Sequence, residues 1–252
     1  MGLSSPLSLC LLYSILAVLV RLRFRKRWAT LFLCGVLAVC AAVIWRYYRK
    51  PLYNLWQTAA VRLVPNDSPP GPWPPEVGRP FPDLLLSDSG GWLTRISRFR
   101  GKVLLVELVA AGSPASVALA GGHAYGPFEG VAPQANLQSL TQYLATFGQV
   151  DVRHPDLIHV RIMILNRHAQ PPSAHDLRQW ERHFNLGEQP NAVTLAAPPE
   201  LVTEAARRLA PGFYLVDRNF VVKAESCGIR PKHDFYTYVI PLLHDLLEET
   251  SH

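Results

Sequence analysis

A short turn of small residues carries the first side chains in this sequence that could do chemistry. Ser113-Pro114-Ala115-Ser116 follows a run of Val and Leu, residues 103–109, in which Glu107 is the one charge. A serine hydroxyl becomes a nucleophile when a general base takes its proton and an oxyanion hole accepts the developing charge. A helix starting at Pro114 would offer N–H groups to an anion, and His123 lies nearby in sequence. No triad order is visible, so we do not predict a hydrolase.

The cysteines supply a second candidate for chemistry. Cys10, Cys34 and Cys40 lie in apolar N-terminal runs, where small packing residues are expected, and only Cys227 belongs to the rest of the chain. No intramolecular disulfide can therefore form in that part, although intermolecular pairing of Cys227 can. We interpret Cys227 as a partly buried structural thiol, with an intermolecular or peroxide-sensitive thiol as the alternative.

The nine histidines all follow the N-terminal apolar runs. None has the tight spacing to acids, thiols or other histidines that is typical of zinc or copper ligands. We predict no metal and no cofactor.

The elements that would position these side chains alternate between strand and helix. Strands are expected at 84–86, 103–109, 157–165 and 191–196, a hairpin at 213–216 and 221–224, and helices at 134–147, 173–187, 199–209 and 234–248. The 103–109 run is apolar throughout except for its one charge, as in a buried central strand. This order predicts an α/β sandwich.

Residues 76–228 resemble the extracytoplasmic thioredoxin-like proteins of the TlpA, ResA and redoxin type. The similar segments are Val77-Gly-Arg-Pro-Phe-Pro-Asp83, Phe99-Arg-Gly-Lys-Val-Leu-Leu-Val106 and Pro211-Gly-Phe-Tyr-Leu-Val-Asp217. The resemblance implies a thioredoxin-like sandwich, with a central mixed sheet flanked by helices, behind an N-terminal membrane helix. It also implies that Pro211 is a cis-proline and that Ala210 and Pro211 present backbone groups to an extended peptide.

The departures from that family decide the chemistry. Ser113-Pro114-Ala115-Ser116 stands where the family has Cys-Pro-Pro-Cys, and a serine hydroxyl cannot exchange with a disulfide. Peroxiredoxin and copper-chaperone activities are excluded at this turn as well, because both require cysteine thiolates there. Gly112 replaces the family's tryptophan, and Glu107 falls where the family keeps a buried acid. Because the turn has no thiol with which Glu107 could exchange a proton, Glu107 is either a relic without a present function or a polar anchor that binds Ser113, Ser116 or water.

A glycine- and proline-rich insertion, residues 120–133, interrupts the helix expected after the turn. Four glycines and two prolines in it are incompatible with a helix, so a loop is predicted. This loop would border a binding groove expected around Ser113 to Ser116 and Pro211. His123, Tyr125 and Phe128 in this loop are candidates for partner recognition. A surface loop without a role is the alternative.

The first fifty residues predict a membrane anchor. Possible spans are 3–20 and 28–45, separated by a basic loop, 21–27. Residues 51–75 are expected to be a juxtamembrane stretch and a proline-rich linker, and 76–252 the thioredoxin-like domain. Five basic residues in 21–27 against three in 46–50 place that loop in the cytoplasm and the domain outside it, in the periplasm or on the outer surface.

The charge outside the anchor excludes one class of partner. The net charge is +6, but beyond residue 50 the remaining 17 Lys and Arg face 19 Asp and Glu. A domain this close to neutral lacks the basic stripe of a nucleic-acid-binding protein. The expected partners are therefore the membrane and a protein or an extended peptide.

We therefore expect a membrane-tethered, redox-inactive thioredoxin-like domain that binds a partner segment. The alternative from another class is a thiol-disulfide enzyme acting through the single Cys227. A third interpretation is a structural subunit of a membrane assembly, in which the 28–45 span would be essential and the groove dispensable.

Overall fold

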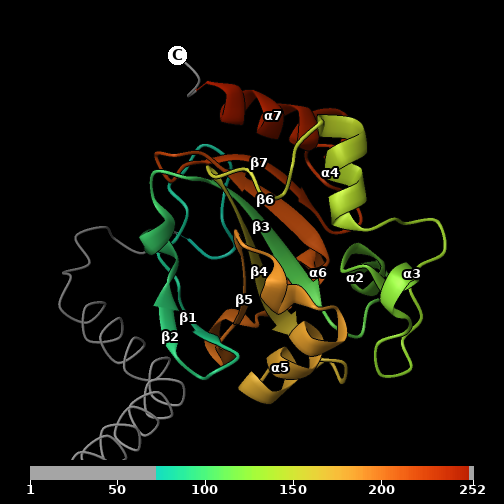
Figure 1. Ribbon diagram of the computed structural model, residues 1–252. Helices are drawn as coiled ribbons and strands as arrows, with labels where there is room; N and C mark the ends of the chain where they lie inside the picture. The colour runs from blue at the N-terminus through green and yellow to red at the C-terminus, as the bar shows by residue number, and fades with distance from the viewer. Residues whose placement is uncertain (1–71, 250–252) are drawn as a thin grey trace, which may run out of the picture. The chain divides into compact units, whose positions relative to one another are not determined.

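The computed structural model describes residues 72–249, which fall in the second of the two units into which the chain divides, Ala60–His252. This part is a seven-stranded mixed sheet with helices on both faces (Figure 1). The predicted mixed α/β class is confirmed. The predicted spans 3–20 and 28–45 lie outside the described residues, and no helix within 72–249 is long and apolar enough to cross a bilayer.

The strands are β1 (Leu85–Asp88), β2 (Leu93–Arg95), β3 (Val103–Ala110), β4 (Leu157–Leu165), β5 (Ala192–Ala196), β6 (Gly212–Val216) and β7 (Val222–Cys227). The α-helices are α2 (Pro114–Leu119), α3 (Gly122–Tyr125), α4 (Leu140–Gly148), α5 (Ala174–His183), α6 (Glu204–Leu209) and α7 (Ile240–Glu248). Short 3₁₀ turns are η1 (Ile96–Phe99), η2 (Leu186–Glu188) and η3 (Pro199–Leu201), and a π-helical turn, η4 (Phe235–Val239), precedes α7.

The strands are ordered β2-β1-β5-β4-β3-β6-β7. β3 lies parallel to β4 and antiparallel to β6, and β7 closes a hairpin with β6. All eight residues of β3 are buried, as its continuous apolar run predicts for a central strand. In chain order, β3 is followed by α2 to α4, β4, α5, β5, α6, the β6–β7 hairpin and α7. This alternation of strand and helix, ending in a hairpin and a helix, is the one expected of a thioredoxin-like sandwich.

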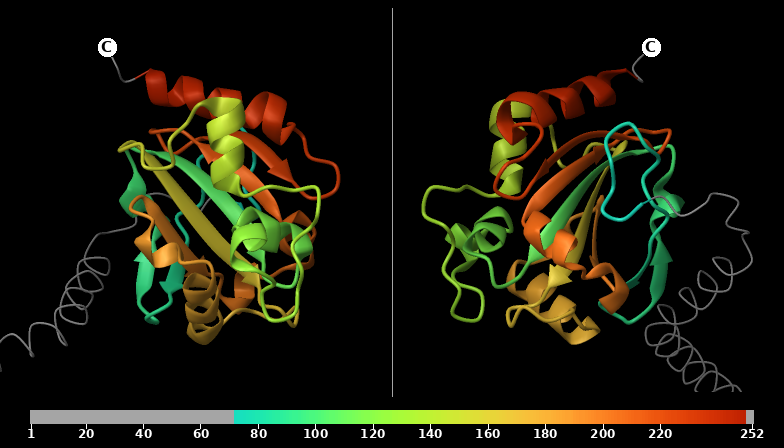
Figure 2. Two further views of the ribbon diagram at one scale, coloured as in Figure 1. Left: turned by 45° about the vertical axis from the view of Figure 1, so that its right-hand side comes forward. Right: turned by 180° about the vertical axis from the view of Figure 1, so that it is seen from behind.

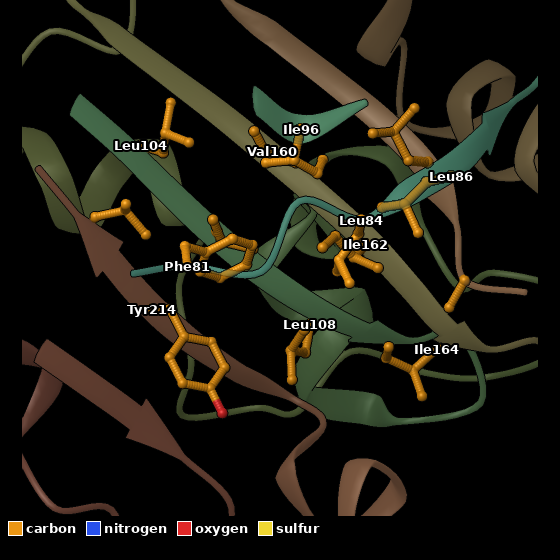
Figure 3. Close-up of a cluster of buried hydrophobic side chains, with 14 of the residues drawn as sticks. Phe81, Leu84, Leu86, Ile96, Leu104, Leu108, Val160, Ile162, Ile164 and Tyr214 are labelled. Atoms are coloured by element: carbon orange, nitrogen blue, oxygen red, sulfur yellow. The ribbon is translucent and has the colours of Figure 1, made fainter. Parts of the chain in front are cut away.

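The two faces of the sheet are covered by different elements, since alternate strand residues point to opposite sides. Leu104 and Leu108 pack with residues of the N-terminal segment and of α6 on one face, as Figure 3 shows for Phe81, Leu84 and Leu86. The right-hand view of Figure 2 shows the N-terminal segment and α6 on this side of the sheet. On the other face, Val103 and Leu105 pack with residues of α4 and α7, and Val109 packs with residues of α2 and α5.

The outer edge of β7 is already paired. The Gly78 N–H donates to the Val222 carbonyl over 2.8 Å, and the Val222 N–H donates to Arg79 over 2.9 Å. Further along, the His233 N–H donates to the Glu225 carbonyl over 3.1 Å. These bonds satisfy backbone groups that an edge strand would otherwise expose.

Helix starts depend on capping side chains. Ser173 caps α5 through the Asp176 N–H, as predicted. The helix predicted from residue 134 begins only at Leu140, because Ser139 forms a capping box with Gln142. The helix predicted at 199–209 is divided, because Thr203 accepts the Ala206 N–H and starts α6 there.

Two expectations about irregular segments need correction. The insertion 120–133, expected to be free of helix, contains the four-residue helix α3 (Gly122–Tyr125). The last residues of the predicted linker contact the domain, since the Trp73 Nε1–H donates to the Leu201 carbonyl over 2.8 Å.

Candidate functional site

The Ser-Pro-Ala-Ser turn joins the carboxyl end of β3 to the start of α2. Ser113 is the N-cap residue, and Pro114 occupies the first helical position, where its fixed φ angle suits a helix start. Gly112 is required by close packing, because a Cβ there would lie 2.8 Å from the Arg167 carbonyl oxygen. The large aromatic side chain that the family carries at this position would not fit.

The two serines of the turn have different surroundings. Ser116 is fully buried, and its Oγ accepts the Ala110 N–H over 3.2 Å, which ties the start of α2 to the end of β3. Ser113 is half-buried, and its side chain makes no capping bond. Within residues 72–249, neither hydroxyl is hydrogen-bonded to a histidine or a carboxylate, so the turn has no base that would activate a nucleophile.

The pairing of β6 with β3 brings Ala210 and Pro211 to this turn. Leu108 lies opposite Gly212, so the two residues before Gly212 run beside the last residues of β3. The Ala210–Pro211 peptide bond is cis, as the resemblance implies. Ala210 is half-buried and extended, with φ −92° and ψ 134°, and its N–H makes no hydrogen bond within the described part of the chain.

Glu107 lies in a buried polar cluster that the sequence analysis missed. Its Oε2 is 2.9 Å from His159 Nε2 and 3.7 Å from Arg161 Nε, both on the neighbouring strand β4. We expected Glu107 to anchor Ser113, Ser116 or water if it was not a relic; instead it bonds to these two side chains. The parallel register explains the contact, since Glu107 is paired with Arg161.

The electrostatics of this cluster follow from burial. Burial lowers the pKa of His159 to about 4, and the Arg161 charge acts in the same direction, while the Glu107 hydrogen bond opposes both. Burial also lowers the pKa of Arg161, which stays charged at neutral pH. The imidazole is therefore neutral, and its Nε2–H donates to the Glu107 carboxylate.

A signal for this cluster was present in the sequence. His159 and Arg161 interrupt the apolar run 157–165 two residues apart, which places both side chains on one face of a buried strand. Buried charges are normally paired, so these residues required an acidic partner on an adjacent strand. Glu107 is the acid within the buried strand β3.

The insertion 120–133 is held against the domain. His123 Nε2 lies 2.8 Å from the Leu137 carbonyl and 3.2 Å from that of Gln134, so the ring links the two ends of the loop. Phe128 is buried, with its ring centroid 4.9 Å from that of Trp180 in α5. Its ring is thus unavailable to a partner, whereas Tyr125 is 49% exposed.

Cys227 is a poor nucleophile in this structure. Its side chain is buried, and the Sγ–H donates to the Phe213 carbonyl over 3.4 Å. Burial raises the pKa of the thiol to about 12, and disulfide exchange requires the thiolate. This geometry supports the structural interpretation of Cys227 over the catalytic one.

Metal-binding side chains do not gather at the turn. Across residues 72–249, no group of three His, Cys, Asp or Glu side chains is placed to hold a metal ion.

Comparison with known proteins gives fold-level neighbours only. No family model matches the sequence, and no curated protein matches it. The solved structures similar to this chain include a provisionally assigned protein disulfide isomerase from Bacteroides thetaiotaomicron, with a TM-score of 0.46 at 11% identity, over 73% of this chain and 98% of that one. They also include BsSco, a member of the Sco family of cytochrome c oxidase assembly proteins, with a TM-score of 0.42 at 12% identity over 69% and 95% of the two chains. A thioredoxin-like protein from Bacteroides caccae has a TM-score of 0.40 at 12% identity over 69% and 50%. The order and direction of the strands described above are those expected of a thioredoxin-like sandwich.

Proposed function

We propose that this chain is a membrane-tethered thioredoxin-like domain that binds an extended segment of a partner protein outside the cytoplasm and does not catalyse disulfide exchange. The observation that carries the proposal is the juxtaposition of Ala210 with the serine turn. Ala210 presents an extended backbone with an N–H that has no hydrogen bond within residues 72–249. An extended peptide pairs with such a backbone by main-chain hydrogen bonds.

The absence of catalysis is supported by the side chains around that backbone. Ser113 and Ser116 stand where a dithiol would act, and Cys227 is buried with a pKa raised to about 12. A bound segment would therefore be held without being oxidised or reduced.

Disulfide-reduction turnover by the full chain in detergent tests the redox part of the proposal. We expect no turnover from the wild type and measurable turnover from a Ser113→Cys/Ser116→Cys variant, because both residues lie at the start of α2 and a helix start lowers the pKa of a thiol. Turnover by the wild type that disappears in Cys227→Ser would instead establish the one-cysteine enzyme.

Site-specific photocrosslinking in cells tests the binding part. A photoreactive residue replacing Ser113 should give a discrete adduct with a partner protein, whereas the same residue at Thr146, exposed on α4, should not. Equal crosslinking from both positions, or none from Ser113, would contradict the proposal.

A further inference from the structure

The loop after β7 runs beside the backbone of the candidate site. Gly212 of β6 lies opposite Cys227 of β7, and beyond this pair the Gly228 N–H donates to the Leu209 carbonyl over 3.3 Å. A Cβ on Gly228 would lie 2.7 Å from the Arg208 carbonyl oxygen, so the two chains remain in contact there. The loop that begins at Gly228 therefore lies next to Ala210.

This loop presents an apolar side chain to solvent. Ile229 is 99% exposed, more than any other large apolar residue of the described part. A single exposed isoleucine is common on protein surfaces and needs no partner by itself. Here it follows Gly228, which is hydrogen-bonded to Leu209, the residue before Ala210, so one bound segment could cover both Ile229 and the Ala210 backbone.

The same loop carries positive charge without counter-ions. Arg230 and Lys232 are exposed, and within residues 72–249 neither forms an ion pair, whereas Arg208 on the neighbouring helix is paired with Glu204 over 3.1 Å. The chain beyond residue 50 is close to neutral, with 17 basic and 19 acidic residues, so this excess is local. Local charge of one sign selects partners of the opposite sign and speeds their encounter.

We propose that the bound segment is extended and acidic, with carboxylates facing Arg230 and Lys232 and an apolar side chain over Ile229. This rests on the proposed function, because the segment is anchored by the Ala210 N–H. In an extended strand alternate residues point to one side, so a sequence alternating acidic and apolar residues presents carboxylates on one side and apolar groups on the other.

Fluorescence anisotropy with three labelled peptides tests this specificity. The probes are Asp-Val-Glu-Val-Asp-Val-Glu, the same peptide with serine at the acidic positions, and the same peptide with lysine there. The full chain in detergent should bind the acidic peptide about tenfold more tightly than the serine peptide, and the lysine peptide most weakly. Added salt should reduce the difference.

Charge reversal tests whether Arg230 and Lys232 cause the preference for the acidic peptide. Arg230→Glu/Lys232→Glu should abolish the preference for the acidic peptide, because it replaces the attracting charges with repelling ones. Arg153→Glu/Arg182→Glu, which changes the same number of exposed arginine and lysine charges elsewhere on the domain, should leave the preference unchanged. A preference that survives the first double substitution overturns the inference.

The outcomes separate this inference from the proposed function. If the three peptides bound equally and Ser113→Trp blocked their binding, the result would support the proposed peptide-binding site at the turn. It would refute the preference for acidic peptides. No binding of any peptide at concentrations up to about 1 mM counts against both. The Arg230→Glu/Lys232→Glu variant could also differ from the wild type in its association with nanodiscs of anionic lipid but not in its peptide affinity. That result would mean that the loop contacts the membrane and that the inference is wrong.

Discussion

Gly212, next to the candidate site, has no room for a side chain. A Cβ there would lie 2.4 Å from the Leu209 carbonyl oxygen and 2.8 Å from the Cys227 sulfur. The absence of a side chain lets β6 and β7 approach closely, which buries the thiol and carries the chain into the bond between Ala210 and Pro211. The absence of a side chain at Gly212 therefore contributes to the burial of the Cys227 thiol and to the path of the backbone at Ala210, where a partner is proposed to bind.

Replacing this glycine should destabilise the domain. We expect Gly212→Ala to lower the free energy of unfolding by about 3 kcal/mol, because the methyl group would overlap backbone atoms that cannot move independently. Gly187→Ala is the matched control, since no atom lies within 4 Å of a Cβ at that position, and it should change stability by less than about 1 kcal/mol. Denaturant unfolding of both variants measures the difference; equal effects would contradict the packing argument.

His159 should make stability depend on pH. Its pKa is about 4 in the folded state against 6.5 for a free histidine, so the unfolded chain binds the proton first as pH falls. The contribution of His159 to the free energy of unfolding is therefore fully present above pH 6.5. It declines by about 3 kcal/mol as the pH falls towards 4. His159→Gln should remove this part of the decline in denaturant unfolding measured from pH 7 to pH 4.

The control for this titration is His168→Gln, because His168 is exposed. Its pH profile should follow that of the wild type. A profile for His159→Gln that parallels the wild type would show that another group titrates in this range.

At the scale of elements, the insertion 120–133 is a packed part of the domain. Phe128 contributes its ring to the core formed with α5, and His183 of α5 lies with Nε2 3.2 Å from the Gly126 carbonyl. Arg167, in the loop after β4, donates to the Glu129 carbonyl over 2.7 Å. The loop therefore extends the core beyond the sheet and limits how far Tyr125 can move.

A pair of substitutions distinguishes the packed aromatic residue from the exposed one. Phe128→Ala should lower the free energy of unfolding by about 3 to 5 kcal/mol, because it leaves a cavity against Trp180. Tyr125→Ala should cost less than about 1 kcal/mol, since its side chain is half exposed. Thermal unfolding gives the comparison; similar losses from both would mean that the loop does not pack as described.

The sequence predicted the elements whose signals are local. The buried strand 103–109 and the capped helix after Ser173 are confirmed, because apolar runs and capping residues act over a few positions. The cis bond at Pro211 was implied by the resemblance alone. The partners of Glu107 and the burial of Phe128 were not predicted, because they depend on strand register and on α5, which lies far along the chain.

At the scale of the whole molecule, the proposed tether determines where the proposed binding site at Ala210 can act. We expect the full chain to stay with membranes during carbonate extraction and a variant lacking residues 1–50 to be released, because both predicted spans lie there. Protease added outside intact cells or spheroplasts should digest the domain, since the basic loop 21–27 is expected in the cytoplasm. Protection of the domain would reverse the orientation.

The paired outer edge of β7 has a consequence for assembly. Backbone bonds from Gly78, Arg79 and His233 occupy the positions that another chain would use to continue the sheet on that side. Open strand edges are templates for fibre growth, and this one is closed. A domain that captures extended segments at Ala210 can therefore do so without recruiting further copies along this edge, so capture need not propagate into polymerisation.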